Sequence, residues 1–160
     1  MAKDSIHDLL KKFAGVPERL EKNLSMAVRM AAQEAASEAK RNHGYTDRSS
    51  VLTNSIGPDG PHGSFRANNL HAIVSAGASY GVFIEKGTKP HVIKPKHRKA
   101  LRWTGPAGFI FSRKGVKHPG TKPYRFLENS VKETMPKLRG DLIPDAIELS
   151  FVQAGFRRGQ

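Results

Sequence analysis

The chain has 160 residues and no cysteine, which excludes disulfide bonds and thiolate metal sites. Lys and Arg number 27 against 14 Asp and Glu, so the formal net charge is +13, and such an excess indicates a polyanion or an acidic surface as partner. Hydrophobic residues make up 38%, typical of a lean globular domain, but no uncharged apolar run approaches the roughly 20 residues of a membrane span. Residues 1–5 lack the apolar core of a secretory signal, so we expect a protein made in the cytoplasm with no membrane partner.

Two helices are predicted for the N-terminal part, residues 1–41. The first covers residues 4–14, where apolar residues recur at helical spacing and Asp4 or Ser5 can act as cap. The second begins near Pro17, which suits the first turn of a helix, and ends near residue 41. Its apolar stripe becomes rich in alanine, which indicates close packing: Leu20, Leu24, Ala27, Val28, Ala31 and Ala35.

Residues 42–88 are predicted to supply the small sheet. Residues 57–63 form a loop by their Gly and Pro content, and residues 70–77 partly alternate apolar with small or polar side chains, as a strand does. Residues 80–85 are aromatic and β-branched, so local propensity predicts a strand, with a short helix as the competing prediction.

Residues 89–118 are predicted to form a basic β excursion from the main fold. Residues 92–93, 100–103 and 109–111 are short strand candidates, and we expect the rings of Phe109 and Phe111 in the core. Between Lys86 and Arg125 the chain has no Asp or Glu, so this stretch repels itself unless water or a negative partner surrounds it. The predicted interface residues are Lys94, Lys96, Arg98, Lys99, Arg102, Trp103, Arg113, Lys114 and Lys117.

Three interpretations of this basic excursion stay open. Cations beside an exposed aromatic ring suit contacts with phosphates and bases. Basic β arms also bind acidic protein neighbours, and a charged loop can simply be solvated.

Residues 119–160 are predicted to form C-terminal helices and a tail. Pro136 is expected to end the first of these helices, and a last helix is predicted for residues 144–154. The order of elements predicts one α+β domain, in which a small, mostly antiparallel sheet is flanked by a long N-terminal helix and by C-terminal helices. The apolar residues on the faces of these two helices are Phe126, Leu127, Val131 and Met135, then Ile147, Phe151 and Ala154.

No residue set carries a convincing catalytic or metal site. His91, His97 and His118, with nearby cations, resemble the acid, base and phosphate-binding groups of a small basic nuclease, which stays as an alternative. The surrounding cations would repel a divalent metal, and no carboxylate is near in sequence to orient an imidazole. Glu85 stands beside Lys86, where an ion pair or a hydrogen-bonded hinge is a better interpretation than a general base. We therefore expect no enzyme and no cofactor.

Several phrases, in this order, resemble a family of bacteriophage neck and tail-completion proteins. They are FIEKGTKPHVI at residues 83–93, KALRW at residues 99–103 and HPGTKPYRFL at residues 118–127. Thr46, followed by LTNSI at residues 52–56, is similar to a further motif of the family, from which this chain departs by extra residues before Leu52 and by the loop at 57–63. The match covers about residues 17–140. The residues that define the fold in this resemblance are Phe83, Ile84, Glu85, Gly87, Thr88, Pro123, Phe126 and Leu127.

The resemblance implies a structural virion protein at the head–tail junction of a long-tailed phage. It implies a homo-oligomeric ring, a hexamer with a dodecamer as alternative, that joins the head connector to the tail and lets DNA pass. The partners would be other copies of the chain, the neighbouring head-connector and tail proteins, and genomic DNA in the lumen. The N-terminal helices and the basic excursion could supply the two unlike surfaces that a ring requires. A nucleic-acid-binding module acting outside a virion is the main alternative.

Overall fold

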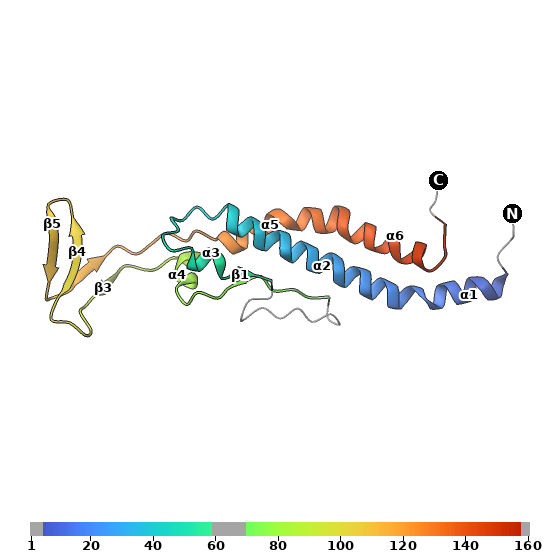
Figure 1. Cartoon of the computed structure of the whole chain (residues 1–160), viewed down its shortest axis with the longest axis horizontal. Coiled ribbons are helices and arrows are strands. Elements are labelled where there is room, and N and C mark those ends of the chain that lie inside the picture. Colours follow the sequence, from blue (N-terminus) through green and yellow to red (C-terminus); the bar gives the residue numbers. More distant parts are fainter. Residues whose placement is uncertain (1–4, 59–69, 158–160) are drawn as a thin grey trace. The chain divides into compact units, whose positions relative to one another are not determined.

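The computed structural model describes residues 5–58 and 70–157 (Figure 1). The chain divides into two compact units, which we treat separately. The helical unit comprises Met1–Gly81 and Arg125–Gln160, and the hairpin unit comprises Val82–Tyr124. Long helices and small antiparallel sheets make up the fold, so the α+β prediction is confirmed. The predicted basic excursion lies within the hairpin unit.

The two N-terminal helices begin and end close to their predicted limits. Ser5 caps α1 (Ile6–Ala14): its side chain accepts a hydrogen bond from the backbone N–H of His7 at 3.2 Å, and the carboxylate of Asp8 accepts one from the backbone N–H of Ser5 at 3.3 Å. Gly15 alone separates α1 from α2 (Val16–Arg41), which carries a proline in its first turn, as predicted.

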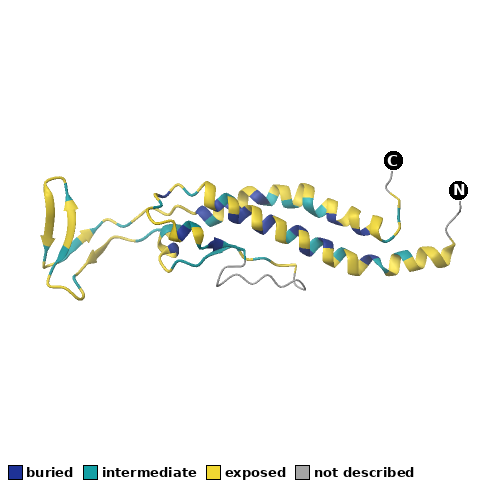
Figure 2. Ribbon diagram, viewed as in Figure 1, coloured by how far each residue is buried: buried dark blue, intermediate teal, exposed yellow. Residues whose placement is uncertain are grey.

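Helix α2 packs against α5 (Phe126–Lys137) and α6 (Ile143–Gln153) through a face of small residues. Figure 2 shows buried residues following the line where these helices meet. Alanine at these positions allows close approach but buries little apolar area per residue. The buried alanines of α2 are Ala27, Ala31, Ala32, Ala35, Ala36 and Ala39.

A buried polar pair connects α2 to α6. The Asn23 amide donates hydrogen bonds to the Ser150 hydroxyl at 2.9 Å and to the Gln153 side-chain oxygen at 3.1 Å. The Ser150 hydroxyl in turn donates to the Ala146 carbonyl at 2.6 Å. Because a buried polar group is costly without its partners, this network favours one alignment of α6 along α2.

The prediction that Pro136 ends its helix was wrong. Helix α5 contains Pro136 and continues through a π-helical turn, η2 (Leu138–Leu142), into α6. Prolines and π-type turns are both sites where a helix can bend rather than end. Since α5 and α6 both pack on α2, tertiary contacts stabilise the continuous path despite the hydrogen bond that the proline removes.

The apolar core of the helical unit lies near the start of α5. Phe126 is only 1% exposed, and the ring of Tyr45 packs edge-on against it with 5.2 Å between centroids. The short helix α3 (Val51–Asn54) contributes the buried Leu52, and the buried Ile56 follows it. The LTNSI phrase therefore supplies core residues to the helical unit.

The residues before Leu52, where the chain departs from the family pattern, form a hydrogen-bonded turn. The Asp47 carboxylate accepts hydrogen bonds from the Thr53 hydroxyl, from the Ser50 N–H at 2.7 Å and from the Ser49 N–H at 3.3 Å. These bonds, the one from Thr53 foremost, hold the pKa of Asp47 below its usual value.

Three two-stranded antiparallel sheets are present in the described parts of the chain, one in the helical unit and two in the hairpin unit. The strand predicted at residues 70–77 is much shorter than expected, and the loop predicted at residues 57–63 lies mostly outside the described residues. The pairs are β1 (Ile56–Gly57) with β2 (Ser75–Ala76), β3 (His91–Ile93) with β6 (Val116–His118), and β4 (Leu101–Gly105) with β5 (Gly108–Ser112).

Residues 80–85 lie largely in a helix rather than in the strand that local propensity predicts. Helix α4 (Gly81–Lys86) confirms the competing prediction. High β propensity mostly reflects how a side chain packs on a half-buried sheet, and here Val82 and Phe83 are exposed on a helix instead.

Candidate interface site in the hairpin unit

The two longest phrases of the family resemblance meet at the base of the basic excursion. Thr88 and Thr121 exchange backbone hydrogen bonds of 3.0 and 3.1 Å, and their hydroxyls lie 3.1 Å apart. Both glycines beside them have left-handed backbones, with φ of +69° at Gly87 and +87° at Gly120. A side chain at Gly87 would collide with the Thr121 carbonyl and lie 2.8 Å from the Pro123 nitrogen. Glycine is therefore required where the two chain segments come into contact.

Strands β3 and β6 continue from this bridge and place two of the three predicted histidines opposite each other. His91 pairs with His118, and their ring centroids are 5.1 Å apart. The ring nitrogen Nδ1 of His91 lies 2.8 Å from the Lys89 carbonyl, and the Gly120 N–H donates to Nδ1 of His118 at 3.1 Å. These backbone bonds fit a structural role for the pair, and the structure records no ring contact between His97 and either of them.

The β4–β5 hairpin carries an exposed aromatic and cationic face. Its register pairs Arg102 with Phe111 and Thr104 with Phe109, so these four side chains share one face. The guanidinium of Arg102 lies over the Phe109 ring at 4.5 Å from its centroid, within the range of a cation–π contact.

The expectation that Phe109 and Phe111 belong to the core was wrong. They are 62% and 65% exposed. In a two-stranded sheet, a face is buried only if a further layer packs on it, and local sequence does not say whether such a layer exists. The opposite face, where Trp103 pairs with Ile110, is also partly exposed.

An open hollow of about 780 Å³ adjoins the aromatic face. Arg102 and Phe111 belong to both the face and the hollow, so the two form one continuous surface. We call this surface the basic face. It combines three predicted interface residues with others that the interface prediction missed, among them His97, Phe109 and Phe111. The hollow is lined by His97, Arg98, Lys99, Ala100, Arg102 and Phe111.

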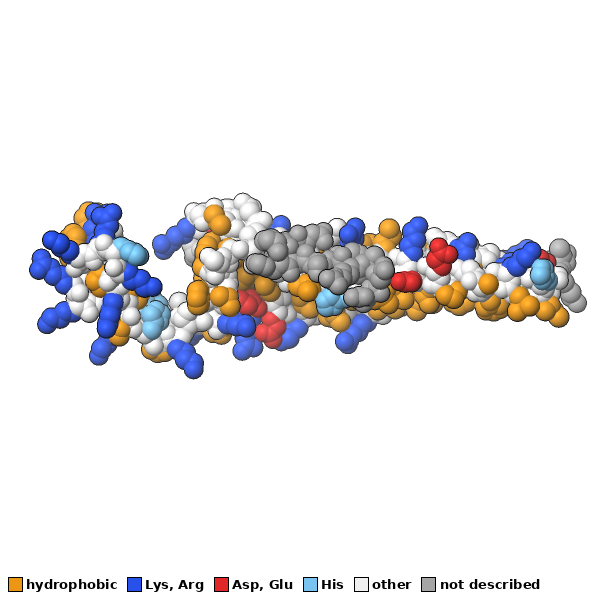
Figure 3. Space-filling model, turned by 90° about the horizontal axis from the view of Figure 1, so that it is seen from below, with side chains coloured by type: hydrophobic (Ala, Val, Ile, Leu, Met, Phe, Trp, Pro, Cys, Tyr) orange, Lys and Arg blue, Asp and Glu red, His pale blue; other side chains and the backbone are white. Residues whose placement is uncertain are grey.

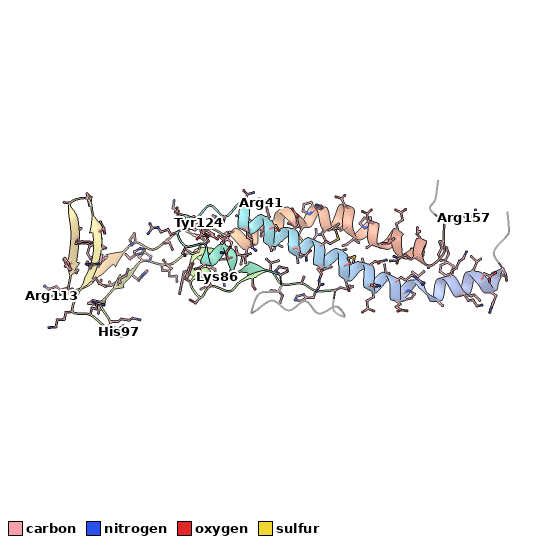
Figure 4. All side chains as sticks on the ribbon, viewed as in Figure 1. Arg41, Lys86, His97, Arg113, Tyr124 and Arg157 are labelled. Carbon is pink, nitrogen blue, oxygen red and sulfur yellow. The ribbon has the colours of Figure 1, made fainter. Side chains whose placement is uncertain are left out.

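Apart from Trp103, the remaining predicted interface residues are exposed cations on other parts of the hairpin unit. Lys94 and Lys96 follow β3, Arg113 and Lys114 lie between β5 and β6, and Lys117 lies on β6. His97 and Arg113 are labelled in Figure 4, on segments that flank the β4–β5 hairpin. Figure 3 shows Lys and Arg side chains distributed over this unit.

These cations have no carboxylate partners within the chain as described. Across residues 5–58 and 70–157, none of the eight predicted interface cations forms an ion pair with Asp or Glu. Their charge is therefore balanced only by solvent ions or by a partner.

The residues that define the fold in the family resemblance divide into core and surface positions. Phe126 is fully buried and Leu127 half-buried, as the start of α5 requires. In α4, Ile84 and Glu85 are half-buried, whereas Phe83 is exposed. Pro123 is exposed, next to Tyr124, whose N–H donates to the Ile84 carbonyl at 3.0 Å.

The alternation of side chains along two paired strands could have predicted the aromatic part of the basic face from the sequence. A turn at residues 105–108 pairs residue 104 with 109 and residue 102 with 111, which places Arg102 beside two phenyl rings. The hollow had no such signal, because it depends on how residues 97–100 pass beside the hairpin.

Among the described residues, no three His, Asp or Glu side chains lie close enough to hold a metal ion. No helix in the described ranges is long and apolar enough to cross a bilayer. Comparisons with protein-family models, with curated proteins and with solved structures find no match for this chain.

Proposed function

We propose that this chain is a structural, non-enzymatic subunit of a bacteriophage neck. In this proposal its copies form a ring, most simply a hexamer, that completes the tail and joins it to the head connector in the virion. Two lines of support converge: the ordered motifs that resemble those of neck and tail-completion proteins, and the surfaces that a single subunit leaves uncovered. The uncovered apolar surface is the observation that carries the proposal.

Helix α1 presents the first uncovered surface. None of its residues is buried, and its apolar side chains Ile6, Leu10 and Phe13 are 79%, 62% and 54% exposed. Figure 3 shows hydrophobic side chains along one edge of the helical unit. Monomeric proteins rarely leave contiguous apolar patches of this kind in water, so such a patch favours a protein interface.

The basic face presents a second, chemically different surface. An isolated two-stranded hairpin is marginally stable in water, and this one exposes phenyl rings as well. Two unlike surfaces on one subunit suit head-to-tail contacts, which close into a ring when the rotation permits.

The ring is tested with the purified full-length chain and a variant of α1. We expect light scattering and electron microscopy to show closed rings for the natural sequence. Leu10→Glu would place a carboxylate on the apolar face of α1, and we expect it to weaken assembly at least about tenfold. Lys11→Glu changes the charge more, at an exposed neighbouring position, and should leave rings intact. A natural chain that stays monomeric at every concentration would overturn the proposal.

The role of the hairpin unit in joining is tested by charge reversal. Lys96→Glu with Lys99→Glu alters two exposed side chains, so we expect folded protein that fails to join heads to tails, with infectious particles reduced by orders of magnitude. The matched control, Lys22→Glu with Lys137→Glu, makes the same charge change at exposed sites of the helical unit. Normal particle yield from the hairpin variant would rule out these lysines as an interface.

The hollow also favours a second candidate, a nucleic-acid-binding module that acts outside a virion. That function requires tight binding by the isolated monomer and needs no ring. A nuclease based on His91, His97 and His118 is a weaker alternative, and cleavage that persists in His118→Ala would eliminate it.

A further inference from the structure

We propose that the basic face binds single-stranded nucleic acid without sequence preference. Phosphates would contact Arg98, Lys99 and Arg102, and a base would stack on the ring of Phe111. The proposed function uses the basic face as one of two contact surfaces of the subunit. This inference goes beyond it by naming nucleic acid as the ligand of that face, and it is argued from the hairpin unit alone.

The charge of the hairpin unit favours a polyanion. This unit holds 11 of the chain's 27 Lys and Arg and only one of its 14 Asp and Glu, so it carries +10 of the net +13. Eight of these 11 cations are lysines. Lysine is depleted in protein–protein interfaces, whereas interfaces with nucleic acid are strongly positive. The composition therefore favours nucleic acid over an acidic protein as the occupant.

The arrangement of the side chains adds a stacking site to this charge. Phe111 is 65% exposed and lines the hollow together with Arg98 and Lys99, so a ring face and cations border the same space. The Arg102 guanidinium already lies over Phe109, and Arg102 pairs with Phe111 across the hairpin. A positive groove with exposed aromatic rings is the combination that binds single strands, because every base has a face that can stack.

A preference for single strands follows from the rings. In a duplex the faces of the bases are covered by their neighbours, and a protein reaches only base edges and phosphates. A phenyl ring gains a base contact only where a base is unstacked. The cations would bind both forms, so the contribution of Phe111 decides the preference.

The expected affinity is modest and depends on salt. Sequence-independent contacts with phosphates give dissociation constants on the order of 10⁻⁵ M at physiological salt. Three cations on a single strand predict a slope of log K against log salt of about −2, and thus a roughly 20-fold loss between 50 and 200 mM salt.

Fluorescence anisotropy of the full-length chain with a labelled oligothymidine and a duplex of equal length tests the proposal. We expect the single strand to bind roughly tenfold more tightly than the duplex. Phe111→Ala should weaken single-strand binding about tenfold and leave the salt slope unchanged. Arg98→Gln with Lys99→Gln should reduce the salt dependence to roughly threefold over the same range.

The controls separate this surface from general charge and from misfolding. Lys22→Gln with Lys137→Gln removes two exposed cations from the helical unit and should change neither affinity nor slope. Phe111→Leu keeps an apolar side chain on the hairpin but removes the ring, and should behave as Phe111→Ala does. Circular dichroism would verify that each variant keeps the fold.

Three outcomes would overturn the inference: no binding at 50 mM salt, equal binding of single strand and duplex with no effect of Phe111→Ala, or an equal loss in the lysine control. Ring formation is scored separately. Rings without binding would overturn this inference alone, and binding by a chain that never assembles would overturn the proposed function alone.

Discussion

Gly87→Val is expected to destabilise the hairpin unit by at least about 3 kcal/mol. Valine is β-branched, and a left-handed backbone costs such a residue about 1–3 kcal/mol even in open space. At φ of +69° its Cβ would also collide with the Thr121 carbonyl and crowd the Lys122 carbonyl carbon at 3.0 Å. Relief of that collision requires the Thr88–Thr121 bridge to open, so we expect the chain segments that carry these two threonines to separate.

Hydrogen exchange at the Thr88 and Thr121 amides measures this effect directly, and thermal unfolding gives its size. Gly108→Val is the matched control, because Gly108 has φ of +115° but no atom within 4 Å of an added Cβ. Gly108→Val should therefore lose only the stability that backbone strain costs, because its side chain collides with nothing. Equal losses in the two variants would mean that the contact with Thr121 contributes nothing.

The same measurement compares Gly87 with a histidine of strand β6. His118→Ala removes the acceptor of the Gly120 N–H, a single hydrogen bond worth about 1 kcal/mol. Gly87→Val should therefore lower the melting temperature more than His118→Ala does. The reverse order would contradict the view that the glycine, and not the histidine, is essential at this base.

Phe126→Ala is expected to lower the free energy of unfolding of the helical unit by about 3–5 kcal/mol. Phe126 is the largest fully buried side chain described, and it packs against Tyr45 at the start of α5. Most of the other buried apolar residues described are alanines, which bury little area each, so few of them can compensate for the cavity.

Urea unfolding followed by circular dichroism measures this loss. Val131→Ala is the control, since Val131 lies on the same helix but is 39% exposed, and it should cost less than about 1 kcal/mol. Similar losses in both variants would show that the stability of the helical unit does not depend on this aromatic core.

Amphipathic spacing and capping residues predicted helices correctly where the deciding residues lie within one or two helical turns of each other. The Ser5 cap, Pro17 in the first turn and the long alanine-rich stripe predict α1 and α2 closely. Residues 70–77 show the limit for strands, because alternation alone predicted a strand where only Ser75–Ala76 finds a pairing partner. A strand exists only if another segment supplies its hydrogen bonds.

Two predictions were wrong, the helix end at Pro136 and the burial of Phe109 and Phe111, for the same reason. Each depended on contacts with residues that are distant in the sequence. Pro136 was expected to end a helix because a proline disfavours the turn before it, but packing on α2 supports the helix on either side. Phe109 and Phe111 were expected inside because phenyl rings usually are, but nothing else in the hairpin unit, Val82–Tyr124, packs on that face. The contact with α2 outweighs the local preference of the proline, and the lack of a covering layer in the hairpin unit leaves the two phenyl rings exposed.

The amino-acid sequence by itself determined the two N-terminal helices, the excess positive charge between Lys86 and Arg125, and the α+β class, because these depend on spacing and composition within short windows. Only the tertiary structure decided that Gly87 and Thr88 meet Gly120 and Thr121, and that Arg98, Lys99 and Arg102 surround one hollow beside Phe111. The physical reason is distance along the chain. A hydrogen-bonded pair 33 residues apart forms only when the whole intervening segment folds back in one register, and no local propensity specifies that register.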